Sequence, residues 1–206
     1  MERLFPIFVK LAGRKVLVVG AGKMAEGKIE GLLNTGARVR VVALHATERV
    51  QEWVKSGAIT FEERAFAVRD LEGVFVVVVA TSSSSVNELI FREASARGVL
   101  CNVVDVPEQC DFFYPAVVQR GDLQIAISTG GQSPSLAQKL RQQLERQFGP
   151  GYAAWVAALG KTRREVLQSG LAPEEKRFLL QSLASQEAFE RMVSARRTQK
   201  PQGEAA

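Results

Sequence analysis

The feature that most constrains this chain is an apolar strand that runs directly into a glycine-rich turn. Residues 16–19 read Val-Leu-Val-Val, and Gly20-Ala-Gly22-Lys-Met-Ala25 and a helical pattern follow. In the order strand, turn and helix, Gly-x-Gly-x-x-Ala is typical of a dinucleotide site. Gly20 would allow the tight turn, Gly22 would let a pyrophosphate approach the backbone, and Ala25 would permit close packing of helix on strand. The alternative is a tight turn that binds nothing.

We expect the phosphates on the amides at the start of this helix, where the helix dipole favours anions. The predicted cofactor contacts from the turn are Gly20, Ala21, Gly22, Lys23, Met24 and Ala25. An acidic residue usually follows about 20 residues later and binds the ribose of NAD. Ala43, Leu44 and His45 stand there instead, and we predict that Ala43 and Leu44 contact the cofactor. Because no acid is present, these residues do not exclude NADP⁺ as the cofactor.

Composition excludes several classes of protein. The 206 residues are 46% hydrophobic and 24% charged, without an apolar run long enough to cross a bilayer or a secretory signal at the start, so we expect a cytoplasmic protein without membrane contact. The net charge of +5 favours acidic partners, but no nucleic-acid motif accompanies it, and an anionic small molecule explains it equally well. Cys101 and Cys110 lack a metal-ligand spacing, and we predict no metal site.

Alternating strand and helix patterns predict an α/β fold with a Rossmann-like, doubly wound parallel sheet. The almost unbroken valine run within residues 74–80 is typical of a strand covered on both faces. The expected strands are 15–20, 38–43, 58–62, 74–80 and 100–104, and the expected helices are 23–35, 47–56 and 86–97, with a short turn at 68–72.

After about Phe113 the pattern changes. Two strands, 116–120 and 123–128, surround Gly121-Asp122, which is a strong hairpin signal, and helices follow from Pro134 with breaks at 149–151 and 170–173. Short helices with apolar faces favour packing on a second subunit, with packing on the rest of the chain as the alternative. The predicted domains are an NAD-binding Rossmann domain over 1–113, a small α+β hairpin–helix unit for dimerisation and substrate binding over 114–148, a helical carboxyl-terminal domain over 149–197 and a disordered tail over 198–206.

Several motifs in register carry a family resemblance. They are Leu4-Phe-Pro-Ile-Phe8, Val19-Gly-Ala-Gly22, Ala80-Thr81, Val86-Asn87, Cys101-Asn-Val-Val-Asp105, Phe112–Pro115 and Ser128-Thr-Gly-Gly-Gln-Ser-Pro134. Together they resemble the precorrin-2 dehydrogenase module of siroheme synthases. The resemblance implies an oxidoreductase of siroheme (porphyrin) biosynthesis that uses NAD to convert precorrin-2, a tetrapyrrole polycarboxylate, to sirohydrochlorin. Its partners would be these tetrapyrroles, with a homodimer expected; insertion of Fe²⁺ by ferrochelatase activity stays open.

Asp105 is the residue predicted to carry chemistry. It follows strand 100–104, at the edge where open parallel sheets bind ligands. Oxidation of precorrin-2 removes a hydride and a proton, so a carboxylate could act as general base, and the resemblance implicates the aspartate of this motif in catalysis. The alternative is that Asp105 initiates the turn before Pro107.

Two loops complete the predicted site. Thr81 and Ser82 follow the valine strand and are expected beside the cofactor, as is Asn102, although a flexible polar loop is the alternative for 81–85. Open amides and hydroxyls in the loop 128–134 could receive a substrate carboxylate, and a merely well-capped helix is the alternative there. The predicted substrate contacts are Ser128, Thr129, Gly130, Gly131 and Ser133.

The alternative function is a regulatory Rossmann module that senses NAD without catalysis. It would explain the glycine-rich turn and the dimer-like helices. It would leave the motifs at 101–105 and 128–134 without a shared purpose, and we therefore favour the enzyme.

Overall fold

The computed structural model describes residues 3–198, which form two compact units. One unit is Phe5–Tyr114, and the other consists of residues 115–198 together with residues 3–4. The finer division at residues 148–149 stays a prediction. Among the described residues, no helix is both long and apolar enough to span a bilayer.

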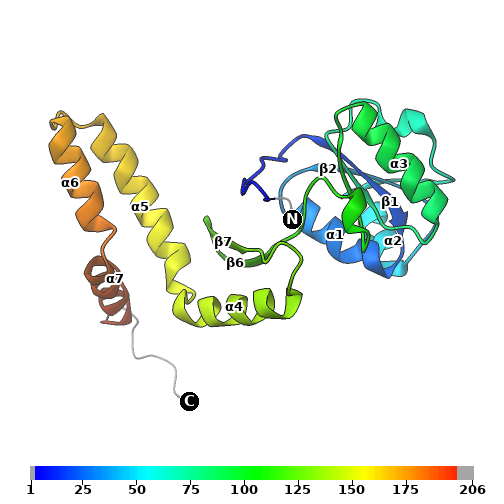
Figure 1. The fold of residues 1–206 in the computed structure, drawn as a ribbon. Coiled ribbons are helices and arrows are strands. Elements are labelled where there is room, and N and C mark those ends of the chain that lie inside the picture. Colours follow the sequence, from blue (N-terminus) through cyan, green and yellow to red (C-terminus); the bar gives the residue numbers. More distant parts are fainter. Residues whose placement is uncertain (1–2, 199–206) are drawn as a thin grey trace, which may run out of the picture. The chain divides into compact units, whose positions relative to one another are not determined.

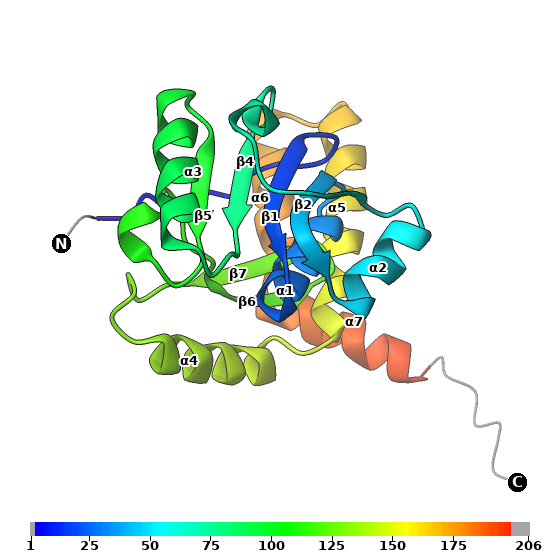
Figure 2. The same cartoon turned by 90° about the vertical axis from the view of Figure 1, so that its right-hand side faces the viewer.

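The Phe5–Tyr114 unit is a five-stranded parallel sheet with the strand order β3-β2-β1-β4-β5 (Figures 1 and 2). This arrangement confirms the predicted Rossmann-like α/β fold. Its strands are β1 (Lys15–Ala21), β2 (Arg38–Ala46), β3 (Thr60–Glu63), β4 (Val76–Val79) and β5 (Leu100–Val103). Its helices are α1 (Lys23–Leu33), α2 (Glu48–Lys55) and α3 (Ser84–Ala96), with single 3₁₀ turns η1 (Val68–Leu71) and η2 (Pro107–Gln109).

The core lies on both faces of this sheet, because successive strand residues point to opposite sides. Val16 and Val18 of β1 pack with Ile29 of α1 in one apolar cluster. Leu17 of β1 packs with Ile90 of α3 in a second cluster on the other face. The all-valine strand β4 contributes to both clusters, which explains why it carries no polar residue.

The observed elements differ from the predicted ones mainly at their ends. Strand β2 runs on to Ala46, because Ala21 at the end of β1 pairs with that residue. Helix α3 begins at Ser84, two residues earlier than predicted, because the Ser83 hydroxyl caps it by accepting from the Val86 amide (3.5 Å).

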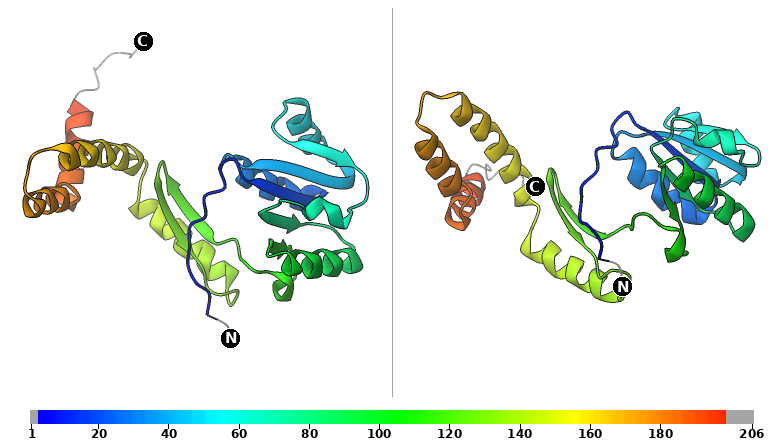
Figure 3. Two further views of the ribbon diagram at one scale, coloured as in Figure 1. Left: turned by 90° about the horizontal axis from the view of Figure 1, so that it is seen from above. Right: turned by 45° about the horizontal axis from the view of Figure 1, so that its top comes forward.

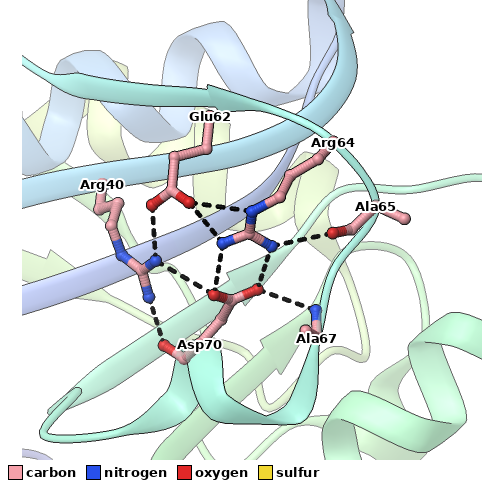
Figure 4. A network of polar contacts seen from close by, with 6 residues as sticks. All are labelled: Arg40, Glu62, Arg64, Ala65, Ala67 and Asp70. Atoms are coloured by element: carbon pink, nitrogen blue, oxygen red, sulfur yellow. Dashed lines mark hydrogen bonds and ion pairs between the residues drawn. The ribbon is translucent and has the colours of Figure 1, made fainter.

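A network of charged side chains fixes the edge strand β3 to its neighbours (Figure 4). Its centre is Asp70 of η1, of which only 2% is exposed. Both carboxylate oxygens of Asp70 accept from the Arg64 guanidinium (2.7 and 2.8 Å), and one also accepts from Arg40 of β2 (3.2 Å). Glu62 of β3 accepts from the same two arginines, each at 2.9 Å. The network therefore ties the turn η1 to β2 and β3, which the backbone ladder already pairs with each other.

Replacing Asp70 with asparagine should lower the free energy of unfolding by about 2 kcal/mol, because the partly exposed arginines lose a buried charged acceptor. The hydrogen bonds from Arg64 hold the pKa of Asp70 well below its usual range in the folded protein. Its stabilising effect is therefore present above the unfolded-state pKa of about 4 and is lost as the pH falls from there towards the folded-state pKa. Urea unfolding at neutral and acid pH should show a difference between wild type and variant that shrinks in acid.

The control for this prediction is Glu72→Gln, which neutralises an exposed acid next to η1. It should leave stability unchanged at both pH values. An equal loss of stability in Asp70→Asn at neutral and acid pH would contradict the assigned role.

The second unit begins with an antiparallel hairpin of β6 (Ala116–Arg120) and β7 (Leu123–Ile127), as predicted from Gly121-Asp122. Helix α4 (Pro134–Gln147) lies along this hairpin (Figure 3). The Arg120 guanidinium ties the hairpin to the end of α4 by donating to the carbonyl oxygens of Phe148 (2.8 Å) and Glu145 (3.2 Å).

Three further helices follow: α5 (Gly151–Gln168), α6 (Pro173–Leu183) and α7 (Gln186–Thr198). Phe189 of α7 packs against Tyr152 and Trp155 of α5, with ring centroids 4.3 and 5.0 Å apart. The break between α6 and α7 was not predicted, although Ser185, which caps α7 through the Ala188 amide (3.2 Å), is a usable signal. Thr198 of the predicted tail is the last residue of α7, and the remainder, 199–206, lies outside the described residues.

Candidate dinucleotide and substrate site

The turn between β1 and α1 has the conformation that its glycines predict. Gly20 has a φ of +104°, and a Cβ atom there would lie 2.7 Å from the Ala80 carbonyl carbon. Only glycine is compatible with both this positive φ and the close approach of Ala80. The turn therefore passes close against the end of β4, and Ala25 packs fully buried in the core, as predicted.

Gly22 is the residue at which α1 starts, and its surroundings fit a bound pyrophosphate. It has no side chain to cap the first amides of the helix, and a Cβ atom there would meet nothing within 4 Å. Lys23 and Met24 of the first turn are exposed, and the Lys23 ammonium pairs with Glu26 (2.7 Å). Uncapped amides facing open space are what a dinucleotide phosphate needs at a helix start.

The end of β2, where the ribose of a dinucleotide is expected, carries no acid of its own. Ala43 is partly buried, and Leu44 and His45 are exposed. Strand β3 supplies an acid instead: Glu63 pairs in register with Ala43, and its carboxylate lies 3.8 Å from His45 Nδ1. The sequence analysis missed Glu63, because it lies on a neighbouring strand, at a position that only the register reveals.

The loop after β4 is an ordered turn. The Thr81 hydroxyl donates to Asn87 Oδ1 of α3 (2.7 Å) and accepts from the Ser83 amide (3.2 Å), while the Asn87 amide donates back to the Thr81 carbonyl (3.3 Å). Ser82 is exposed at this turn. The hydrogen bonds hold residues 81–83 at the same edge of the sheet as the glycine turn.

Asp105 stands just past β5 in an uncommon conformation. Within residues 3–198 it alone among non-glycine residues has a positive φ, 63°. Aspartate tolerates this left-handed region better than most residues, but the conformation still costs energy and is frequent at functional sites. Its carboxylate is exposed at the carboxyl end of the parallel sheet.

Asn102 lies within β5 and is buried. Its side-chain amide donates to the Phe112 carbonyl (2.8 Å) and contacts Cys110 Sγ (3.4 Å). Next to it, Asp111 accepts from the Cys101 amide (2.8 Å). These bonds hold residues 110–112 against β5, so the visible role of Asn102 is structural, and its predicted contact with the cofactor stays a prediction.

Lys28 is a residue of this edge that the sequence analysis did not select. It lies on α1, is partly buried, and its Nζ atom is 3.8 Å from the centroid of the Tyr114 ring. Burial lowers the pKa of Lys28, and the nearby Asp105 carboxylate opposes that shift. The sequence gives no signal for this contact, because a lysine on a helix is normally a solvent-exposed surface residue.

The predicted substrate loop, between β7 and α4, belongs to the second unit. Its glycines 130 and 131 have positive φ values of 60° and 81°. The Gly130 amide donates to the Ser128 hydroxyl (3.1 Å), and the Ser133 amide donates to the Thr129 hydroxyl (3.0 Å). Ser133 also caps α4 through the Leu136 amide (3.3 Å), so part of the predicted donor set is used within the loop.

No group of three or more His, Cys, Asp or Glu side chains among residues 3–198 is arranged to hold a metal ion.

Two family models match the chain. One, described as putative NAD(P)-binding, covers residues 7–116, and the other, described as sirohaem biosynthesis protein central, covers residues 120–147. The siroheme synthase of Nitrosococcus oceani is 41% identical over 147 residues, which are 71% of this chain and 31% of that protein. Siroheme synthase 1 of Pectobacterium atrosepticum is 36% identical over 97% of this chain and 41% of its own length. The chain thus spans less than half the length of these curated relatives.

Among solved structures, SirC, a precorrin-2 dehydrogenase, superposes with a TM-score of 0.81 at 28% sequence identity. The match covers 94% of this chain and 96% of that chain. The likeness therefore extends over both units and agrees with the family models.

Proposed function

This chain belongs to the putative NAD(P)-binding family and is a relative of the siroheme synthases. We propose that it oxidises precorrin-2 to sirohydrochlorin with NAD⁺ as hydride acceptor. The observation that carries the proposal is the likeness to a precorrin-2 dehydrogenase along nearly the full length of both chains. The glycine turn supports it independently, because Gly20 and Gly22 leave the start of α1 open to a dinucleotide phosphate.

The residues at the carboxyl edge of the sheet have different roles in the proposed reaction. Oxidation removes a hydride and a proton from precorrin-2, and NAD⁺, when bound, takes the hydride. Asp105 accepts the proton as general base, because it is an exposed carboxylate at the edge that also carries the glycine turn. Thr81 and Ser82 line the same edge and contact the cofactor. The products are sirohydrochlorin, NADH and one proton.

We assign the loop of residues 128–133 to the carboxylates of the tetrapyrrole. The Gly131 amide has no hydrogen bond to any residue within 3–198, and the Ser128 and Thr129 hydroxyls can donate their own protons while accepting from the loop amides.

The protein is further proposed to act as a cytoplasmic homodimer. Large apolar side chains are exposed in both units, among them Phe5 (84%) and Phe178 (76%), and a second copy would cover such surface. Both cysteines are free thiols, as is usual in reducing compartments.

An anaerobic assay with purified protein, precorrin-2 and NAD⁺ tests the proposed function. NADH and sirohydrochlorin should form in equal amounts. Tight NAD⁺ binding without either product would refute the oxidation and favour a module that only senses NAD. A second arm adds Fe²⁺ to sirohydrochlorin. Metal insertion above the protein-free rate would show a ferrochelatase step, for which Asp105 is the available base.

The charges around the end of β2 favour NAD⁺ over NADP⁺. The Glu63 carboxylate would repel a 2′-phosphate and can accept a hydrogen bond from the ribose hydroxyl. Arg49 and Arg64, which follow β2 and β3 in the sequence, could otherwise bind a 2′-phosphate. Each is already paired with a carboxylate, Arg49 with Glu52 (3.1 Å) and Arg64 with Asp70.

Replacing Glu63 with arginine should therefore shift the ratio of NADP⁺ to NAD⁺ affinity by about tenfold or more, because repulsion becomes attraction. Calorimetric titration with each dinucleotide measures this ratio without reference to activity. Glu72→Arg, the same charge change at an exposed position beside η1, should leave the ratio unchanged. If wild type and Glu63→Arg had the same ratio of NADP⁺ to NAD⁺ affinity, the ribose would not bind next to Glu63.

A further inference from the structure

Lys28 makes no ion pair within the described residues 3–198. No hydrogen bond or ion pair joins its ammonium to any other residue in the described part of the chain, whereas Lys23, earlier on the same helix, pairs with Glu26. The ammonium lies over the face of the Tyr114 ring, 3.8 Å from its centroid. This contact holds the charge in place but leaves its three hydrogen-bond donors unused.

The surroundings of Lys28 make an anion favourable there. The side chain is partly buried, and burial lowers its pKa, whereas Asp105 and the thiol of Cys110 act in the opposite direction. A cation that has lost part of its hydration gains most from an added negative charge. The Tyr114 ring that contacts Lys28 follows residues 111 and 112, which hydrogen bonds hold against β5, and Asp105 stands just past the end of that strand.

The anion at Lys28 is a different one from the dinucleotide phosphate. The pyrophosphate is expected at the uncapped amides that follow Gly22, at the start of α1. Lys28 comes five residues after Lys23, which is about 7 Å further along the helix axis. Its contact with Tyr114 ties it to the segment that packs on β5, the strand that leads to Asp105.

We propose that Lys28 binds a carboxylate of the tetrapyrrole substrate and so places the macrocycle against Asp105. The assignment rests on the proposed function, because it takes the substrate to be a polycarboxylate. Lys28 is thereby a substrate-positioning residue, held by the Tyr114 ring.

The test compares Lys28→Met, which keeps most of the unbranched side chain and removes the charge, with Lys28→Arg, which keeps the charge. Lys55→Met, at an exposed end of α2, is the matched control for the loss of one positive charge. Fluorescence titration with sirohydrochlorin and calorimetric titration with NAD⁺ measure the two ligands separately. Thermal melting confirms that the variants fold.

Lys28→Met should weaken sirohydrochlorin binding and raise the KM for precorrin-2 by about tenfold, with kcat and NAD⁺ affinity close to wild type. Lys28→Arg should restore most of the binding, and Lys55→Met should behave as wild type. Unchanged tetrapyrrole affinity in Lys28→Met would overturn the assignment, and so would a loss of NAD⁺ affinity as large as the loss of tetrapyrrole affinity. Activity of the wild-type protein would still support the proposed function in either case. A wild-type protein that neither bound the tetrapyrrole nor reduced NAD⁺ would overturn both.

Discussion

Replacing Asp105 with asparagine should lower kcat for precorrin-2 oxidation by about 10²- to 10⁴-fold, the usual effect of removing a general base. Asparagine has nearly the same shape and also tolerates a positive φ, so the backbone at 63° need not change. Alanine would be a poorer choice, because it would add strain to the loss of the carboxylate. The rate of NADH formation at saturating precorrin-2 and NAD⁺ measures the effect.

NAD⁺ affinity and melting temperature should both remain close to wild type in Asp105→Asn. The matched control is Glu108→Gln, which neutralises an exposed acid three residues further on, in η2. It should retain full activity. If Asp105→Asn kept wild-type kcat, Asp105 would be only the first residue of a turn, and the base would have to be sought elsewhere.

The fold of the Phe5–Tyr114 unit could be predicted because the side chains that are apolar in the sequence pattern of β1 and β4 are also the ones that the structure buries. The valines of β4 have the composition of a strand covered on both faces, and the structure buries them all. Gly20, Gly22 and Ala25 could be interpreted for the same reason: their roles follow from backbone geometry, which one sequence segment determines.

The parts of the site that could not be predicted depend on contacts between segments distant in the sequence. Glu63 reaches the end of β2 through strand pairing. Lys28 of α1 contacts Tyr114, which is far beyond the window of about 11–18 residues in which a periodic pattern can be recognised. The hydrogen bonds of the Asn102 side chain to Cys110 and Phe112 also join distant segments, and its contact with the cofactor stays a prediction.

The two glycines of the turn should respond differently to the same added methyl group. At Gly20, with φ at +104° and the backbone of Ala80 in the way, alanine adds about 1–2 kcal/mol of conformational strain and about 1–3 kcal/mol of overpacking. Gly20→Ala should therefore lower the melting temperature of the protein by roughly 10 °C and weaken NAD⁺ binding because the turn is displaced.

Gly22→Ala should leave the melting temperature unchanged and still weaken NAD⁺ binding by about tenfold or more. Its φ of −83° suits any residue, and its Cβ would meet no protein atom within 4 Å, so the methyl group would occupy only the space that the pyrophosphate needs. Gly27→Ala, which also meets nothing within 4 Å but lies further along α1, should change neither property for the worse. Melting curves and NAD⁺ titrations of the three variants separate fold from binding. Wild-type NAD⁺ affinity in Gly22→Ala would mean that the phosphates bind away from the start of α1, whereas wild-type stability in Gly20→Ala would mean that the turn can move off β4.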